Sequence, residues 1–556
     1  MPTILSADQL FELEADRTLE ADHIREVAES IDALHFPVAF PEVFLRDRPG
    51  FDALVGNPPW EAATVHKRTF WALRFPGLKG FSQAKLNREV ERLEQERPDI
   101  ATEYEAAVAQ AEQVRRLLLA GPYPGIGTGD PDLYKAFSWR FWHLVREEGA
   151  VGVVLPRTAL AGRGSEPWRR DVLFGGTFDD VTMLLNTRGW VFDDAEHRYT
   201  IGLVAIRKGQ DHVGTLRMRG PYPSRARYDD GMKAKPAEFS SEDFETWTET
   251  AAFPLLPSPE AAGVFAQIRS HSRLDDNGGD WFARPIRELD SNLDKKHMIL
   301  QVEEPEGAWP VYKGASYDLW DPDTGEYYAW ADADYIIGVL QAKRLRQQRN
   351  PRSAFSAFSI EWARDLSTLP CRHPRIAIRK VTRATDTRTV RAALVPSNRV
   401  LTDAAQYLAW SRGDSSDEAY LLGVLCSMPL DWYARRFVEV NLNFHILNAF
   451  PIPQPDREDP LRKEVVKIAG RLAAVDGRFT EWAAEVDVPI GSVTAEEHDE
   501  LIARLDAVVA LLYGLDEDDL RVVYSTFHEG WNYEPRLSAV LNHHRQLAPQ
   551  SAEVGA

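Results

Sequence analysis

The sequence is poor in cysteine and lacks long apolar runs. Its two cysteines, Cys371 and Cys426, lie far apart and have no cysteine or histidine at metal-ligand spacing. This excludes a disulfide framework and argues against a structural metal site. The apolar runs at 151–155, 335–340 and 507–512 are too short to span a bilayer. The first residues have no signal-peptide pattern, so we expect a cytoplasmic protein that needs no metal.

Positive charge is also scarce in the chain as a whole. There are 65 Lys and Arg against 85 Asp and Glu, which gives a formal net charge of −20 over 556 residues. This sum does not exclude a nucleic-acid partner, because DNA responds to the local field of one surface. Whether cations cluster along the chain is therefore the more informative question.

The length allows two or three domains, each with its own core. Residues 1–35 predict acidic amphipathic helices, and residues 36–215 predict an α/β domain with a mostly parallel sheet. Within that domain, residues 61–122 predict a charged, solvated helical insertion. Residues 216–455, rich in Pro, Gly, Trp and Arg, predict a mixed α+β domain, and residues 456–556 predict helices.

Apolar runs locate the strands of the α/β domain. Residues 51–56 predict a short buried strand that ends in a loop, and residues 150–155 predict a strand buried on both faces. Further strands are predicted at 180–185 and 199–207, and a helix at 132–146. Strands that alternate with helices in this way are typical of a Rossmann-like layer.

A proline-rich corner follows the first of these strands: Gly56-Asn57-Pro58-Pro59-Trp60. The exocyclic amino group of adenine is a poor nucleophile because its lone pair is delocalised into the ring. The Asn57 side-chain oxygen and the Pro58 carbonyl can accept its two hydrogens, which favours a tetrahedral nitrogen with its lone pair directed at a methyl donor. The prolines hold these acceptors in place, and Trp60 offers a face for a base rotated out of the duplex. The alternative is a simple proline turn between a strand and a helix.

These residues resemble the gamma-arranged adenine-N6 DNA methyltransferases of bacterial restriction-modification and phage-defence systems. Further segments match in order: Asp132 to Phe137, Gly149 to Pro156, and Trp190-Val191-Phe192 ahead of the strand at 200–206. The resemblance implies S-adenosylmethionine as the cofactor, bound through Asn57, Leu133 and Phe137. It also implies that Phe192 stacks on the face of the flipped adenine opposite Trp60.

The resemblance extends into the second domain, where three segments are similar to the target-recognition domain of large single-chain enzymes. They are Tyr312-Lys313-Gly314, Ile376-Ala377-Ile378-Arg379, and Asn441-Leu442-Asn443-Phe444 through Pro451-Ile452-Pro453. The implied substrate is double-stranded DNA, methylated at adenine N6 within a specific site.

One element of the family pattern is missing. The family binds its cofactor through a Gly-rich loop after a first strand, upstream of the corner, but residues 1–56 contain no such strand and loop. Gly125-Ile126-Gly127-Thr128-Gly129 follows a helical stretch, so we interpret it as a flexible connection. Either a second polypeptide supplies the cofactor loop, or the chain is a split-gene fragment, or it is a DNA-recognition subunit without catalysis of its own.

Cations cluster in the second domain. Residues 343–399 contain 14 Lys and Arg against three acids, a local excess of 11 in an acidic protein. A solvated basic face is the alternative, but the position after a base-modifying loop favours a DNA surface. The candidate DNA-contacting residues are Lys343, Arg344, Arg346, Arg349, Arg379, Lys380, Arg383 and Arg388.

A protein-glutamine or RNA methyltransferase remains as another class, because these enzymes also use Asn-Pro-Pro loops. They rarely carry an Arg-rich domain of this size after the catalytic one. The sequence therefore favours a DNA methyltransferase that flips its target base between Trp60 and Phe192.

Overall fold

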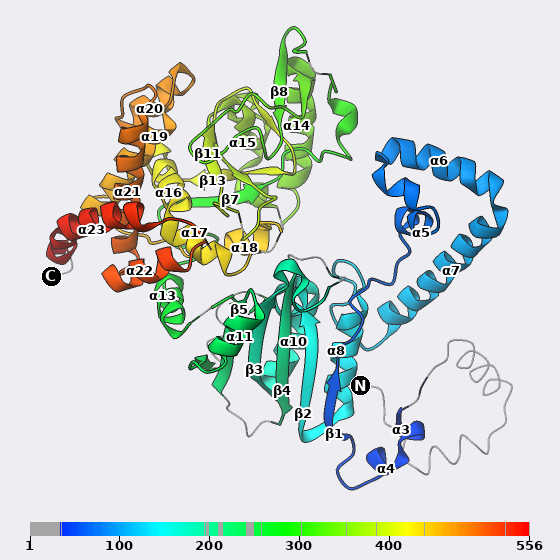
Figure 1. The fold of residues 1–556 in the computed structure, drawn as a ribbon. Helices are drawn as coiled ribbons and strands as arrows, with labels where there is room; N and C mark the ends of the chain where they lie inside the picture. Colours follow the sequence, from blue (N-terminus) through cyan, green and yellow to red (C-terminus); the bar gives the residue numbers. More distant parts are fainter. Residues whose placement is uncertain are drawn as a thin grey trace. The chain divides into compact units, whose positions relative to one another are not determined.

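A computed structural model shows the chain as two compact units, Met1–Phe253 and Pro254–Ala556 (Figure 1). The residues that it describes are 34, 36–193, 195, 199–209, 215–240, 250–256, 258–301, 303–351, 353–384, 386–438, 440–528 and 530–554. The predicted helical segment 1–35 lies outside these residues, apart from Leu34. Among the described helices, none is long and apolar enough to cross a membrane.

The first unit is built on a six-stranded sheet in the order β1-β2-β4-β3-β5-β6. Its strands are β1 (Phe51–Gly56), β2 (Val145–Pro156), β3 (Gly176–Leu185), β4 (Thr200–Lys208), β5 (Thr215–Tyr222) and β6 (Ala237–Ser240). The α/β class and the four predicted strands are confirmed. The apolar runs that predicted them are long enough for strands and too short for helices of ordinary length.

The prediction of a mostly parallel sheet is wrong. β1 is parallel to β2 and β3 is parallel to β5, but β4 is antiparallel to both of its neighbours, β2 and β3. The reason is that the chain leaves β3 and re-enters the sheet as β4 between β2 and β3, without a crossover helix. The sheet is therefore mixed.

The predicted domain boundary after residue 215 also differs from the structure. β5 begins at Thr215 and pairs with β3, and β6 pairs with β5, so the sheet continues to Ser240. The change of composition that suggested the boundary falls within the last two strands of the sheet and their loops. The first unit ends later, at Phe253.

Helices cover the sheet and extend beyond it. α8 (Leu133–Leu144) and α10 (Glu166–Gly175) pack on the sheet, against β2 and β3. Between β1 and α8 lies a helical arm of α5 (Lys67–Arg74), α6 (Gln83–Glu96) and α7 (Pro98–Ala120), with the short helix η1 (Pro76–Gly80) (Figure 1). The arm has its own core, formed by Phe70, Trp71, Leu78, Leu86, Val90, Leu93 and Ile100.

The second unit combines two small sheets with a helical region, as predicted for a mixed domain followed by helices. The first sheet is antiparallel: β11 (Ala392–Val395), β10 (Arg375–Arg379), β13 (Ala405–Arg412) and β7 (Phe282–Ile286). The second contains β12 (Val400–Leu401), β8 (Ala308–Tyr312) and β9 (Ala329–Asp332). The principal helices are α13 (Pro259–Arg269), α14 (Ala333–Gln348), α16 (Ser415–Cys426), α17 (Met428–Arg435), α19 (Pro460–Ala473), α21 (Ala495–Leu512), α22 (Glu517–Ser525) and α23 (Glu534–Val554).

Candidate functional site

The predicted corner lies at the carboxyl end of β1, outside the core. β1 ends at Gly56, and residues 57–60 have no regular structure. Asn57 is exposed to solvent, whereas Pro58 is buried and fixes the loop to the fold. A Cβ atom on Gly56 would lie 2.9 Å from the end of the Phe141 ring, so α8 approaches the end of the strand closely here. The amide of Asn57 is thus presented at the surface on a rigid support.

The two predicted base-stacking residues lie together. The rings of Trp60 and Phe192 are in edge contact, with centroids 5.8 Å apart and planes at 87°. A base between two parallel rings needs about 3.5 Å on each side, or roughly 7 Å between the rings. The structure therefore brings the pair together in a closed arrangement, and a base could enter only if Phe192 moved away from Trp60.

Asn186 holds the segment that carries Phe192, a role that the sequence interpretation missed. This residue is fully buried at the end of β3. Its side-chain nitrogen donates to the carbonyl oxygen atoms of Phe192 (2.9 Å) and Ala195 (3.3 Å). Its side-chain oxygen accepts from the backbone nitrogen atoms of Val191 (3.2 Å) and Phe192 (3.0 Å). An asparagine directly after an apolar strand, with glycine three residues later, was the available signal.

Backbone bonds connect the corner to the start of α8, where the cofactor residues were predicted. The backbone nitrogen of Leu133 donates to the carbonyl of Glu61 at 2.9 Å, and that of Ala63 donates to Pro131 at 3.3 Å. One helical turn further along α8, Phe137 is 39% exposed and makes an edge contact with Phe141. The fold therefore places Leu133 close to the chain segment that leaves the corner, and Phe137 offers an exposed aromatic face on the same helix.

The glycine-rich segment 125–129, which we predicted to be a flexible connection, packs against the fold at Gly125. Gly125 has φ of +85°, and a Cβ atom there would lie 2.4 Å from the carbonyl oxygen of Gly164. The buried Lys135 ammonium donates to the Asp130 carbonyl at 2.5 Å and lies 3.1 Å from the Asp132 carboxylate. The segment is thus a fixed turn between α7 and α8, and it does not follow a strand.

β1 is an edge strand, although its sequence is typical of a buried one. Among the described strands it pairs with β2 alone. Val55 is 88% exposed, and Ala53 is also exposed. On β2, by contrast, Val151, Val153 and Leu155 are all buried. An apolar strand with one open edge exposes both backbone groups and side chains that could pair with a further strand.

In the second unit, the fold itself uses several of the cations predicted to contact DNA. Lys343 forms an ion pair with Asp294 at 2.6 Å. Arg344 is buried, and its guanidinium donates to the Thr368 hydroxyl at 2.9 Å and the Asp365 carbonyl at 2.6 Å. In this fold Arg344 does not present its charge to solvent.

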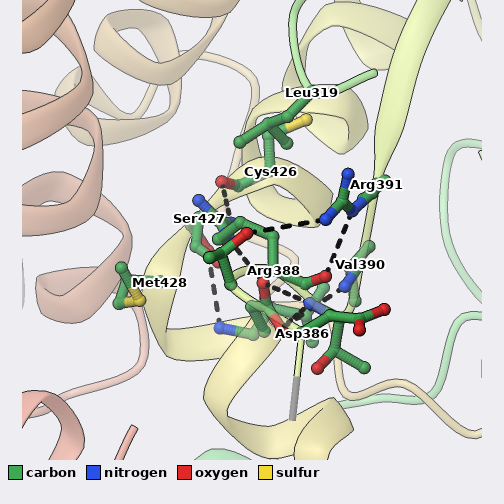
Figure 2. Close-up of polar contacts among 12 residues, drawn as sticks. Leu319, Asp386, Arg388, Val390, Arg391, Cys426, Ser427 and Met428 are labelled. Atoms are coloured by element: carbon green, nitrogen blue, oxygen red, sulfur yellow. Dashed lines mark hydrogen bonds and ion pairs between the residues drawn. The ribbon is translucent and has the colours of Figure 1, made fainter. Parts of the chain in front are cut away.

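Arg388 is also part of the core (Figure 2). Its guanidinium forms an ion pair with Asp431, whose side chain is fully buried on α17, and donates to the Cys426 carbonyl at the end of α16 at 2.6 Å. The Asp431 carboxylate also accepts from the backbone nitrogen atoms of Thr389 and Val390. Arg388 thus joins the segment after β10 to the junction of two helices.

The remaining predicted cations lie nearer the surface. Arg346 and Arg349, at the end of α14, are exposed, and Arg379 and Arg383 are half-buried. Lys380 lies 4.0 Å from the Asp403 carboxylate. Of the eight predicted residues, Arg346 and Arg349 are therefore the best placed to meet a phosphate.

A small, open pocket lies beside the same helix. Its lining includes the donors Lys343, Arg344 and Gln347 from α14, together with Glu288 and Tyr407. Burial raises the pKa of the Glu288 carboxyl, although the carboxylate bonds to Arg375 at 2.9 Å. The cavity thus has apolar walls and a few polar groups near α14.

Comparison with known proteins finds no matching family model and no matching curated sequence. Among solved structures, the chain is similar to the Type IIL restriction-modification enzyme MmeI in complex with DNA, with 10% identity and a TM-score of 0.39, covering 89% of this chain and 57% of that one. It is also similar to a nuclease-deletion mutant of the Type ISP restriction-modification enzyme LlaGI in complex with a DNA substrate mimic (10% identity, TM-score 0.36, 84% and 44% covered). A third is the type IIG restriction endonuclease BpuSI (14% identity, TM-score 0.27, 81% and 52% covered). The chain spans about half the length of these proteins.

Proposed function

We propose that the chain is the catalytic-loop and DNA-recognition part of a site-specific adenine-N6 DNA methyltransferase in a restriction-modification or phage-defence system. The observation that carries the proposal is the exposed Asn57 on a rigid proline corner, with Trp60 and Phe192 in contact beside it. A corner buried inside the fold would have excluded the proposed function.

Each residue of the corner has a separate task in this proposal. The Asn57 side-chain oxygen and the Pro58 carbonyl accept hydrogen bonds from the two amino hydrogens of the flipped adenine. The nitrogen lone pair then points away from the ring plane, which is the geometry needed for attack on a methyl group. After transfer, the nitrogen carries an extra proton, which leaves to solvent at the exposed corner.

Base entry requires the aromatic pair to open. The backbone around Phe192 is held by four hydrogen bonds between Asn186 and residues 191, 192 and 195. The pair therefore opens by rotation of the Phe192 side chain, while the backbone of its segment stays in place. Stacking of a base on each ring contributes about 1–3 kcal/mol per base, which can offset the separation of the two rings.

S-adenosylmethionine, when bound, supplies an electrophilic methyl group on sulfonium. In this chain, the exposed Phe137 on α8 could pack against its adenine ring. Leu133 lies one turn earlier on the same helix and bonds to Glu61, four residues after Asn57. The open edge of β1 is consistent with further strands from a second polypeptide that complete the cofactor site. We therefore propose that cofactor binding needs a partner chain.

Nucleoside analysis tests the proposed reaction. The chain is expressed together with its neighbouring genes in a host without adenine methylation, and the host DNA is hydrolysed and analysed by mass spectrometry. N6-methyldeoxyadenosine that depends on this chain supports the proposal. Methylation confined to RNA or to protein glutamine, with none in DNA, contradicts it.

Calorimetry with S-adenosylmethionine tests the need for a partner. The purified chain alone should not bind the cofactor, and binding should appear when the partner is added. Binding to the chain alone, with stoichiometry near one, would contradict the need for a second polypeptide. DNA binding without methylation in any combination would instead favour a DNA-recognition subunit.

A further inference from the structure

The helical arm between β1 and α8 has a strongly uneven charge distribution. Residues 62–88 contain six Lys and Arg and no Asp or Glu. Residues 89–120 contain four Lys and Arg against eight Asp and Glu. The prediction of one uniformly solvated insertion therefore combines two chemically different surfaces. The six cations are Lys67, Arg68, Arg74, Lys79, Lys85 and Arg88.

These cations are exposed, and the fold neutralises only some of them. Lys67 and Arg74 form ion pairs with Glu94 (2.7 Å) and Glu103 (3.0 Å) from the acidic part of the arm. For Arg68, Lys79 and Lys85, the described side chains include no carboxylate within ion-pair distance. These three carry the excess positive charge of the arm.

Two of these three cations, Arg68 and Lys79, belong to residues that are in contact. The guanidinium of Arg68 donates to the carbonyl of Lys79 at 3.2 Å, so α5 and η1 bring two positive residues side by side. The Lys85 ammonium lies over the ring of Phe81, 4.0 Å from its centroid. Exposed cations that have no ion-pair partner among the described side chains attract anions from solution.

The arm is anchored at both ends close to the corner. Its first residues are held by the bond from Ala63 to Pro131, six residues after Asn57. Its last helix, α7, packs through Leu118 on Ala136 of α8 and on Ala63. The core around Trp71 and Leu86 joins the remaining helices to one another. A flexible linker would have neither anchor nor core.

We propose that the basic surface of the arm, residues 66–88, contacts the sugar–phosphate backbone of duplex DNA next to the flipped base. The inference rests on the proposed function, because it takes the duplex as the substrate. The ligand chemistry is that of regularly spaced phosphates, which match exposed Arg and Lys side chains. Such contacts would hold the duplex in position without reading its sequence.

Charge removal tests the proposal, with a matched control in the same arm. The test variant is Arg68→Gln, Lys79→Gln and Lys85→Gln. The control is Arg92→Gln, Arg97→Gln and Arg116→Gln, which removes three cations that already pair with Glu89, Asp99 and Glu112. Both are measured as full-length chains by fluorescence anisotropy with duplex DNA between 50 and 300 mM salt, after circular dichroism confirms that each is folded.

The test variant should bind DNA at least about tenfold more weakly at low salt. The slope of log affinity against log salt should fall by roughly 2 to 3, since each phosphate contact contributes about 0.9. The control should keep the slope of the wild type. A second variant, Arg68→Lys, should retain the wild-type slope because it keeps the charge.

Three outcomes would overturn the proposal, and they are distinguishable. If the wild type binds duplex DNA and the folded test variant keeps its affinity and slope, the arm does not contact phosphate although the proposed function stands. If the wild type does not bind duplex DNA at all, with or without its partner, the proposed function fails as well. Much tighter binding of the full-length chain to duplex RNA than to duplex DNA would also contradict the proposal.

Discussion

The chain has two cation-rich segments, residues 62–88 and 343–399, and they use their charges differently. In the second segment, Arg344 and Arg388 are built into the fold. In the first, Arg68 and Lys79 lie side by side at the surface with no described acid near them. The second segment looks more basic in sequence, but acids from distant residues such as Asp294 and Asp431 neutralise part of it. Counting charges along a chain therefore does not measure the charge of its surface.

The largest effect that separates the two segments should come from Arg388. Arg388→Ala removes one of the two guanidinium groups that pair with the fully buried Asp431 carboxylate and leaves Arg435 at 3.7 Å. It should cost about 3 kcal/mol of unfolding free energy, the lower end of the range for breaking a buried ion pair. Urea unfolding of the second unit measures this loss. Arg346→Ala, at an exposed site on the same unit, should change the free energy by less than about 0.5 kcal/mol. Equal effects of the two changes would contradict the structural role of Arg388.

A buried acid of the second unit gives the next effect. Glu418 accepts a hydrogen bond from the Trp482 indole at 2.9 Å, and burial raises its pKa from 4.5 to about 7. The folded chain therefore keeps a proton that the unfolded chain loses first, so stability falls as pH rises from about 4.5 to about 7. Glu418→Gln should remove this slope and gain about 2 kcal/mol relative to wild type between pH 5 and pH 8. A parallel decline in both proteins would show that Glu418 is not its source.

Asn186 is the corresponding buried polar residue of the first unit. Asn186→Ala removes the bonds to the Phe192 segment and should cost about 1–3 kcal/mol of stability. Asn186→Asp keeps the acceptor for the Phe192 nitrogen but loses both donors. We expect it to lower the melting temperature clearly and the methylation rate only slightly. Thermal unfolding and methylation assays report the two effects. Full activity and stability in Asn186→Ala would contradict the positioning role.

The smallest of these effects should come from the exposed cations of α14 and its end. Arg346→Gln with Arg349→Gln should leave stability unchanged and lower the salt slope of DNA binding by about 2. Anisotropy with duplex DNA measures it. An unchanged slope here, with a reduced slope in the arm variant, would place the main phosphate contacts in the first unit.

The local elements of the chain could be predicted from its sequence, because apolar runs and prolines act over short distances. β1, β2 and the corner follow from patterns of a few residues each, whereas the pairing of Trp60 with Phe192 was implied by the family resemblance. Strand order could not be predicted in this way, since the place of β4 between β2 and β3 depends on pairing across the whole sheet. For the same reason, the ion pair between Arg388 and Asp431 could not be predicted, because the two residues are 43 positions apart in sequence.

Residue roles that depend on side-chain direction were also beyond the sequence. From the sequence alone, Asn186 is an ordinary turn residue. Only the structure shows the four hydrogen bonds between its side-chain amide and the segment that carries Phe192. The arm is the opposite case. The separation of its basic and acidic residues is visible in the sequence, but we predicted the whole segment as one charged helical insertion.

A position-resolved map of N6-methyladenine tests the central claim most directly. DNA from cells that express the chain with its neighbouring genes is sequenced as single molecules, for the wild type and for Asn57→Ala. The account predicts one methylated sequence motif with the wild type and a loss of about 100- to 1,000-fold with Asn57→Ala, whose folding is checked in parallel. Methylation of the same motif at wild-type level in the variant would contradict it.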